Sequence, residues 1–250
     1  QSYVGAGQAT PVVIGNAVVF PAGRGGHIRE LGYNSDAGGY VTGDLSLKAP
    51  HLFDNFDIVD MAYQRCPMPV VWSVSTTGLL LGLTYVPEQQ VGAWHWHDTG
   101  ASGAFESVCV IPEGEEDALY AVVRREINGR TVRNIERLST RRFPTLADTF
   151  IVDSGVSYEG APKTVFYVPH LEGQSVAILA DGGVVGRQIV TNGRITLDVA
   201  ASKVHVGLPI RAVLETLPLS LEQLPAFGQM FKKTNGRLLL RQIGRASCRE

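Results

Sequence analysis

Short apolar runs separated by turn residues fill the stretch from residue 70 to residue 138. Gly, Pro, Asn and Asp bound most of the runs, and apolar positions within them tend to alternate, as they do in half-buried strands. We therefore expect antiparallel strands at 70–74, 79–86, 91–97, 105–111, 118–125 and 131–138. Asn128-Gly129 predicts a tight hairpin turn between the last two strands, because both central residues of a type I′ turn need a positive φ.

The strand pattern repeats along the chain, with aromatic residues at similar places. Phe20, Trp72 and Tyr120 each lie in an apolar run that is followed by glycine, at a spacing of roughly 50 residues, which is close to the length of a four-stranded propeller blade. The repeat has two interpretations. It indicates either propeller-like blades, which we favour, or an ordinary antiparallel meander whose spacing is fortuitous.

The periodic pattern of apolar residues is interrupted after residue 142, and this change defines the predicted domains. We expect a partial β-propeller-like region over 1–142 and a linker over 143–163, where turn residues mix with little periodicity. Short strands closed by Gly-containing turns predict a small β-barrel or sandwich over 164–216. Residues 217–242 begin a further, truncated segment. The predicted fold class is therefore all-β.

Strands are also expected outside the repeat. In the first part of the chain, 12–21 and 27–33 read as a hairpin, 34–43 as a polar loop and 56–63 as a further strand. In the small β-domain, the expected strands are 164–168, 175–180, 184–190, 194–197 and 203–207.

The last residues, 243–250, read IGRASCRE. The DNA string ATC GGA AGA GCG TCG TGT AGG GAA encodes this peptide, and that string is the start of a common sequencing adapter. We therefore expect 243–250, including Cys248, to be adapter read-through on a metagenomic fragment. A segment never selected to pack cannot recover its ordering cost of about 1–2 kcal/mol per residue, so we expect it to lie outside the folded sheets.

Composition fits a globular protein without a strongly charged partner. The chain has 250 residues, of which 44% are hydrophobic and 18% charged, and its formal net charge is −2. This charge gives no reason to expect nucleic-acid recognition, and no apolar run approaches the ~18 residues of a membrane span. The cysteines have neither metal-ligand nor disulfide spacing, and we expect Cys66 and Cys109 to be small residues in or near the core.

Candidate chemistry is concentrated in Trp94-His95-Trp96-His97-Asp98. Alternation places His95 and His97 on one face of a strand, and with Asp98 they are the candidate metal ligands. No further group of ligands is evident, so we expect these side chains to pack between strands. The expected structural anchors are Phe20, Trp72, Trp94, Trp96 and Tyr120. We find no catalytic constellation and no cofactor motif, and therefore expect a protein that is not an enzyme.

Several strings in both halves of the chain resemble a family of tailed-bacteriophage structural proteins. They are WHWHDT at 94–99, FESV at 105–108, VIPEG at 110–114, YAVVRR at 120–125, IERL at 135–138, HLEG at 170–173 and KVHVGLP at 203–209. The family is similar to the tail tubular or nozzle proteins of short-tailed phages. The resemblance covers most of 11–241 and contains no active-site motif.

The resemblance implies a virion component, made in the bacterial host cytoplasm and located in the phage tail. It implies a β-propeller with small β-domains, a homo-oligomeric ring, other tail proteins as partners, and DNA that passes through the channel without specific contact. Members of the family are several times longer, so we expect only part of the propeller here. An incomplete propeller leaves strand edges open, so the chain produced alone is expected to aggregate or form mixed oligomers.

Two other functions stay open. A propeller-type carbohydrate-binding module or glycosidase would use Trp72, Trp94 and Trp96 as sugar platforms, with a carboxylate pair such as Glu106 and Asp117. A protein-interaction scaffold of a cellular host is the other alternative. The exposure of the tryptophans distinguishes the carbohydrate-binding hypothesis from the structural one. Sugar platforms lie open in a pocket, whereas structural tryptophans lie buried between strands. Neighbouring genes separate the host scaffold from the phage protein.

Overall fold

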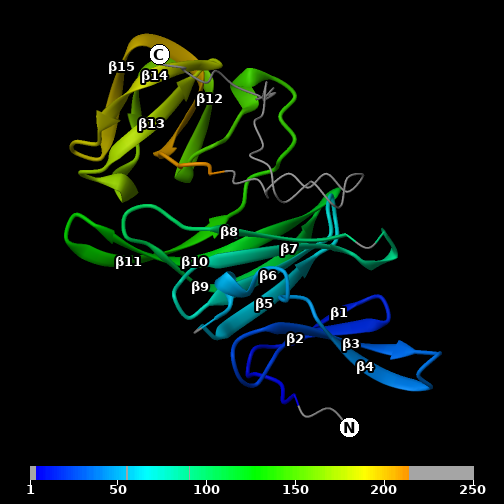
Figure 1. Cartoon of the computed structure of the whole chain (residues 1–250). Coiled ribbons are helices and arrows are strands. Elements are labelled where there is room, and N and C mark those ends of the chain that lie inside the picture. Colours follow the sequence, from blue (N-terminus) through cyan, green and yellow to red (C-terminus); the bar gives the residue numbers. More distant parts are fainter. Residues whose placement is uncertain (1–3, 55, 90, 214–250) are drawn as a thin grey trace, which may run out of the picture. The chain divides into compact units, whose positions relative to one another are not determined.

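The computed structural model is all-β, as predicted, and consists of four antiparallel sheets (Figure 1). The structure describes residues 4–54, 56–89 and 91–213. The helical elements in these ranges are the 3-10 helices η1 (Pro50–Leu52), η2 (Pro87–Gln89), η3 (Leu146–Asp148) and η4 (Pro169–Leu171). None of them has the length and apolar character needed to cross a bilayer. The predictions for 217–242 and 243–250 lie outside the described residues.

The first sheet is a meander in the order β1-β2-β3-β4. Its strands are β1 (Val12–Ile14), β2 (Ala17–Pro21), β3 (Ile28–Asn34) and β4 (Gly39–Asp44). It differs from the predicted hairpin in two places. A turn at Gly15, with φ 56°, divides 12–21 into two strands, and a turn at Gly38, with φ 62°, leads into a fourth strand inside the predicted polar loop. Only glycine adopts such angles without a steric cost, and the sequence reading did not use these two glycines as turns.

The second sheet has the same meander order, β5-β6-β7-β8. Its strands are β5 (Ile58–Gln64), β6 (Val70–Ser75), β7 (Leu80–Val86) and β8 (Val91–His97). Every residue of β6 is buried, because both faces of this sheet are covered. One face packs against the first sheet through side chains such as Val71 and Leu83. The other face packs against the third sheet through side chains such as Trp72 and Val74.

The third sheet has the order β11-β10-β9. Its strands are β9 (Ala104–Glu113), β10 (Glu116–Ile127) and β11 (Arg130–Arg137). The predicted hairpin at Asn128-Gly129 is present, with φ values of 50° and 69°. Leu119, Ala121 and Val123 alternate along β10 and face the second sheet.

The three aromatic anchors occupy equivalent places in the three sheets. Phe20, Trp72 and Tyr120 lie in β2, β6 and β10, which are the second strands of consecutive sheets. Trp72 is 1% exposed and Phe20 is also buried, whereas Tyr120 is partly exposed on the outer sheet. The repeat in the sequence therefore corresponds to successive antiparallel sheets that pack face to face. That these sheets are propeller blades stays an interpretation.

The fourth sheet has the order β12-β15-β13-β14. Its strands are β12 (Asp153–Tyr167), β13 (Ser175–Ala180), β14 (Gly183–Ile189) and β15 (Arg194–Leu208). The predicted linker differs from the structure, because its residues 153–163 belong to β12. The predicted strands 194–197 and 203–207 are parts of one long strand, β15, whose pairing with β12 shifts register between them.

A side chain bridges the open side of the fourth sheet. The Gln188 amide of β14 donates from Nε2 to the Thr196 carbonyl at 2.9 Å and accepts at Oε1 from the Thr196 N–H at 3.3 Å. The Gln188 side chain thus takes the place of a neighbouring strand by pairing with the N–H and the carbonyl of Thr196. The sheet curls toward closure, but backbone pairing among its described strands does not complete a barrel.

Cys66 and Cys109 are exposed, so the prediction that they lie in or near the core was wrong. Cys66 follows β5, and its thiol donates to the Glu115 carbonyl at 3.1 Å. Cys109 pairs with Tyr120 on the face of the third sheet that points away from the second. Alternation predicts that a strand has two faces, but it does not show which face another sheet covers.

Trp72 provides a test of this packing. Its ring lies between two sheets, and Nε1 donates to Oε1 of Gln64 at 2.9 Å. We expect Trp72→Ala to lower the free energy of unfolding by about 3–5 kcal/mol, because it opens a large cavity and removes the donor to Oε1 of Gln64. Urea unfolding measures the loss.

The matched control is Trp96→Ala. Trp96 lies in β8 and is 49% exposed, so this substitution is expected to lower the free energy of unfolding by no more than about 0.5 kcal/mol. Equal losses in the two variants would contradict the assignment of Trp72 as the buried anchor.

Candidate functional site

Residues 94–97 form the end of β8 and present their rings on two faces, and Asp98 follows the strand. His95 and His97 share one face, as expected, and Nδ1 of His95 lies 3.0 Å from Nε2 of His97, so that one ring donates to the other. Trp94 points the opposite way. Its Nε1 donates to the Leu45 carbonyl at 2.8 Å, and its ring meets Phe53 edge-on at 4.7 Å.

The two imidazoles pack on Trp72. The ring centroids of His95 and His97 lie 5.5 and 5.7 Å from that of Trp72. Gly82 is the cross-strand partner of both Trp72 and His95, and a Cβ built on it would lie 2.1 Å from Cε1 of His95. The absence of a side chain at Gly82 therefore makes the space that the imidazole occupies.

Both histidines are held neutral. Desolvation by the surrounding side chains, together with smaller contributions from His97 and the Arg141 guanidinium, lowers the pKa of His95 to about 4. Desolvation also lowers the pKa of His97, again with a contribution from Arg141. The guanidinium carbon of Arg141 lies 5.9 Å from the Trp72 centroid, so one cation faces the ring stack.

The candidate metal ligands His95, His97 and Asp98 do not gain a partner from elsewhere in the part of the chain that is described. No group of three or more His, Cys, Asp or Glu side chains is arranged there to hold a metal ion. The pair is instead packed against a buried tryptophan, with the His95 ring edge-on to Trp72 at 76° and the His97 ring tilted to it at 46°.

The histidines line a cavity of about 930 Å³, which is bounded by the second, third and fourth sheets and the segment that leads into β12. Leu80, Phe105, Leu119, Phe143 and Phe150 contribute apolar walls. Small-molecule sites have volumes of roughly 300–1,000 Å³, so the size alone fits a ligand. His95, His97 and Arg141 are among the polar residues that line this space. Their two neutral imidazoles and one guanidinium can orient a ligand by hydrogen bonds and charge.

His170 and Ser154 also line this cavity, but they do not form a nucleophile and base. Nε2 of His170 lies 2.8 Å from the backbone carbonyl of Ser154 and therefore donates to it. This hydrogen bond engages the backbone of Ser154 and not its hydroxyl, so it does not pair a nucleophile with a base.

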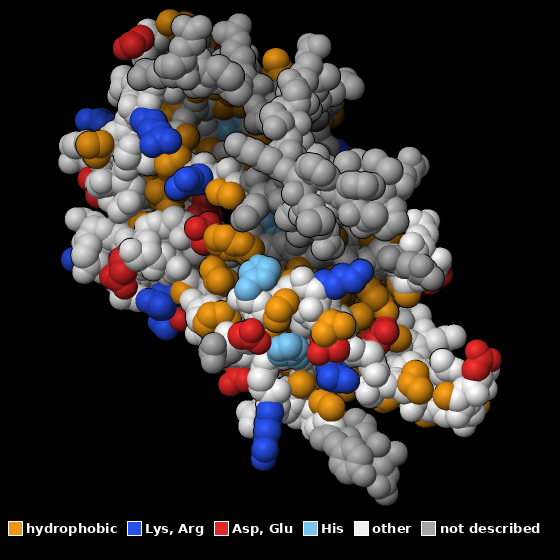
Figure 2. All heavy atoms as spheres, in the orientation of Figure 1, with side chains coloured by type: hydrophobic (Ala, Val, Ile, Leu, Met, Phe, Trp, Pro, Cys, Tyr) orange, Lys and Arg blue, Asp and Glu red, His pale blue; other side chains and the backbone are white. Residues whose placement is uncertain are grey.

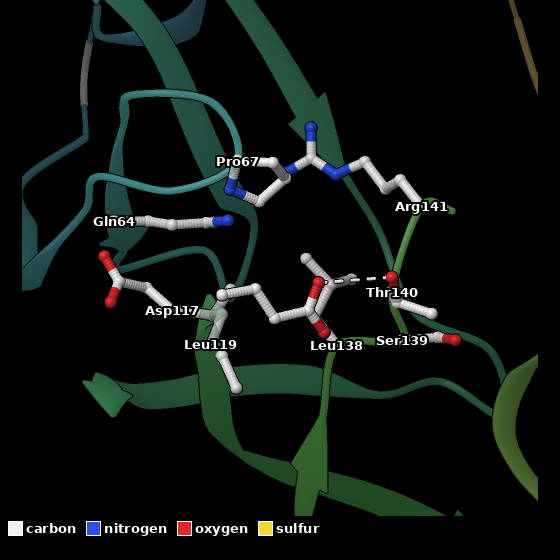
Figure 3. A pocket seen from close by; sticks show the side chains of 10 residues that line it. Gln64, Pro67, Asp117, Leu119, Leu138, Ser139, Thr140 and Arg141 are labelled. Atoms are coloured by element: carbon white, nitrogen blue, oxygen red, sulfur yellow. Dashed lines mark hydrogen bonds between the residues drawn. The ribbon is translucent and has the colours of Figure 1, made fainter. Parts of the chain in front are cut away.

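A second, much smaller pocket lies beside β10 (Figure 3). Gln64, Asp117, Leu119 and Arg141 are among its lining residues, and its volume is about 20 Å³. Such a space holds about one water molecule. It is too small for a substrate, and we assign no chemistry to it.

The residues named for a glycosidase are not brought together. Trp72 is buried between sheets and cannot serve as a sugar platform. Glu106 binds Arg133 near one end of β9, whereas Asp117 pairs with Pro112 near the other end. At about 3.4 Å per residue this separation along the strand is roughly 20 Å, whereas glycosidase carboxylates lie about 5–9.5 Å apart.

Sequence reasoning missed the most highly connected side chain of the region, Arg125. Its side chain is 0% exposed. Nε and Nη2 donate to Glu136 at 3.0 and 2.7 Å, and Nη1 and Nη2 donate to Asp153 at 2.9 and 2.8 Å. Nη1 also donates to the Gly100 carbonyl at 2.8 Å.

Asp153 completes this network from the fourth sheet. It is the first residue of β12, and it also accepts from the Thr99 hydroxyl at 2.8 Å and the Gly100 N–H at 2.6 Å. Burial lowers the pKa of Arg125, but the hydrogen bonds that its guanidinium donates to Glu136 and Asp153 and the charges of these carboxylates outweigh burial, and the pKa of Arg125 is raised overall. The guanidinium is therefore a permanent charge that needs both carboxylates.

The sequence did contain a signal for Arg125. Along β10, the residues 119, 121, 123 and 127 are buried and apolar, and alternation places Arg125 on the same face. An arginine in an apolar row must find buried partners, because an unpaired buried charge is costly. Its partners lie on other strands, so the row alone did not identify them.

No family model matches the chain, and no curated protein matches it. The site is therefore described by its own geometry.

The depressed pKa of His95 predicts a pH dependence of stability. The unfolded chain takes up a proton near pH 6.5, whereas the folded state does so only near pH 4. The unfolded state thus binds more protons in this range, and the stability present above pH 6.5 is lost as the pH falls toward 4. Urea unfolding from pH 7 to pH 5 should show a shallower fall for His95→Gln than for the wild type. Parallel curves would show that His95 contributes nothing.

The Arg125 network predicts different costs for two carboxylates of β12. Asp153→Ala leaves the buried Arg125 with one carboxylate and removes the acceptor of Thr99 and Gly100. We expect it to lower the free energy of unfolding by about 3–5 kcal/mol. Glu159→Ala removes an exposed carboxylate 3.1 Å from Lys203 and should cost less than about 1 kcal/mol. Urea unfolding of both variants checks this ratio, and similar costs would refute the role given to Asp153.

Proposed function

We propose that this protein is a non-enzymatic structural component of a bacteriophage or prophage tail, of the nozzle or tube type. In this proposal it assembles with copies of itself in a ring around the DNA channel and contacts other tail proteins. The protein is made in the bacterial cytoplasm and resides in the virion. The phage part of the proposal rests on the strings that resemble the tail-protein family.

The observation that supports a structural role is that the large aromatic and charged side chains singled out above make contacts within the protein. Trp72 and Trp94 hold sheets together, the rings of His95 and His97 pack against Trp72, and Arg125 joins the third sheet to the fourth. Of the three tryptophans that a lectin could display, Trp72 and Trp94 are thus engaged within the fold, whereas Trp96 is 49% exposed. This favours a scaffold over the carbohydrate-binding alternative.

The surface is compatible with DNA that passes without specific contact. On the face drawn in Figure 2, acidic and basic side chains are interspersed among the described residues, without a large area of one charge. Tight binding to DNA draws much of its affinity from basic side chains that neutralise phosphates, and the formal net charge of −2 gives no overall excess of them.

Two measurements test the proposal. Electron microscopy of the purified chain is expected to show ring-shaped or arc-shaped particles. Sequencing of the DNA that flanks the gene is expected to find genes for terminase, portal and capsid proteins. Flanking genes of a cellular pathway would refute the phage assignment and favour a host scaffold.

A further inference from the structure

Arg141 places a cation without a protein partner at the cavity that His95 and His97 line. Its guanidinium carbon lies 5.9 Å from the centroid of the Trp72 ring, and its side chain forms neither an ion pair nor a hydrogen bond with another described residue. The residue is exposed, so a ligand can reach it. A guanidinium presents N–H donors in a planar fork that matches the two oxygens of a carboxylate. Arg141 can therefore bind an anion that enters the cavity.

Most of the other charged side chains along the cavity already have partners in the protein. Glu136 and Asp153 are bound by the buried Arg125 at 2.7 and 2.8 Å. Arg137 lies 2.8 Å from one carboxylate of the third sheet and 3.2 Å from another. These charges are balanced within the protein, so they neither attract nor strongly repel an entering anion.

Asp98 is an exposed carboxylate on the cavity wall, and its charge does not cancel that of Arg141. Desolvation and the Arg141 guanidinium lower the pKa of His97, and Asp98 raises it to a smaller extent. Desolvation also lowers the pKa of His95, where the charged neighbours that act are His97 and Arg141. The surroundings of both imidazoles are therefore more positive than negative, which favours an anion there.

The imidazole pair adds one hydrogen-bond donor to the guanidinium. The bond between the rings uses Nδ1 of His95 and Nε2 of His97, which leaves Nε2 of His95 and Nδ1 of His97 without a partner among the described residues. A neutral imidazole carries one N–H. The ring that donates within the pair therefore has an acceptor as its other nitrogen, and the ring that accepts has a donor. Whichever ring donates, the pair offers one N–H and one acceptor to a ligand.

Apolar side chains line the cavity from two sheets and from the segment before β12. They are Leu80 of the second sheet, Phe105 and Leu119 of the third, and Phe143 and Phe150 of the segment. The three phenylalanine rings are only partly buried, so they offer apolar surface to a ligand. A small inorganic ion would leave this surface in water, whereas a ligand with an apolar body would cover it and gain free energy from its burial.

We propose that this cavity binds a small organic acid, whose carboxylate meets Arg141 and the free imidazole N–H while its apolar body lies against the phenylalanine and leucine walls. The carboxylate supplies the counter-charge that Arg141 lacks within the described protein. The volume of about 930 Å³ accommodates a ligand of this kind. This inference adds a ligand site to the structural role and does not depend on assembly in a ring.

Isothermal titration calorimetry of the full chain at pH 7 tests the proposal with 2-naphthoate and octanoate, which have an aromatic and an aliphatic body. At least one acid is expected to bind. Its neutral counterpart, 2-naphthalenemethanol or octanol, is expected to bind at least about tenfold more weakly, because it lacks the charge that strengthens hydrogen bonds to a guanidinium. Acetate lacks the apolar body and should bind more weakly than either acid. Binding of neither acid, or equal affinity for an acid and its alcohol or acetate, would overturn the proposal.

A pair of neighbouring arginines supplies matched variants. Arg141→Gln is expected to weaken binding of the acid by at least about tenfold and to leave binding of the alcohol unchanged. Arg142→Gln removes the same charge from an exposed residue that does not line the cavity, and it should bind the acid like the wild type. Equal weakening in the two variants would show a general effect of charge and refute the role given to Arg141. Urea unfolding verifies that both variants fold.

Nuclear magnetic resonance locates the bound acid. The ring C–H signals of His95 and His97 are expected to shift as the acid is added. Those of His27, which contacts Asp44 beside the first sheet and does not line the cavity, should stay in place. Binding that leaves the signals of His95 and His97 unchanged would place the ligand elsewhere and overturn the proposal.

Discussion

The buried guanidinium of Arg125 is the constraint on which the junction between the third and fourth sheets depends. The inward face of β10 changes its partner at this residue: Val123 packs with the second sheet, whereas Ile127 packs in the core of the fourth. A charge without solvent needs compensation from several directions. Glu136 supplies it from the same sheet, and Asp153 supplies it from the first residue of β12.

The same network orders a loop as well as two sheets. The loop between β8 and β9 contributes the Gly100 carbonyl to Arg125 and the Thr99 hydroxyl and Gly100 N–H to Asp153. A Cβ built on Gly100 would lie 3.0 Å from Leu208 of β15, so the loop runs close to the fourth sheet. A hydrophobic contact alone would tolerate sliding, whereas this set of directed bonds fixes one arrangement.

Contacts between the earlier sheets combine apolar packing with a few directed polar bonds. Asp60 of β5 accepts from the Ser107 hydroxyl at 2.7 Å and the Val108 N–H at 2.9 Å in β9. Asp117 of β10 accepts from the N–H groups of Arg65 and Cys66, just after β5. These carboxylates satisfy backbone donors at strand edges and at the ends of strands. Such bonds set the alignment of neighbouring sheets, and the apolar layers between them supply most of the favourable free energy.

The sequence by itself determined the all-β class, most of the strands between residues 58 and 137, and the hairpin at Asn128-Gly129. These features depend on alternation and on local turn angles, which a short stretch of residues specifies. It also indicated that His95 and His97 share a face, since that follows from strand geometry alone. Within single stretches it failed where turns rested on the isolated glycines Gly15 and Gly38.

Only the tertiary structure decided which faces are covered and which distant groups meet. Burial of Trp72 and exposure of Cys109 depend on where another sheet lies, and local alternation contains no such information. The partners of Arg125 come from a loop, from β11 and from β12, and the last of these was predicted to begin as a linker. Long-range contacts of this kind arise from the packing of whole sheets, so no single stretch of the chain encodes them.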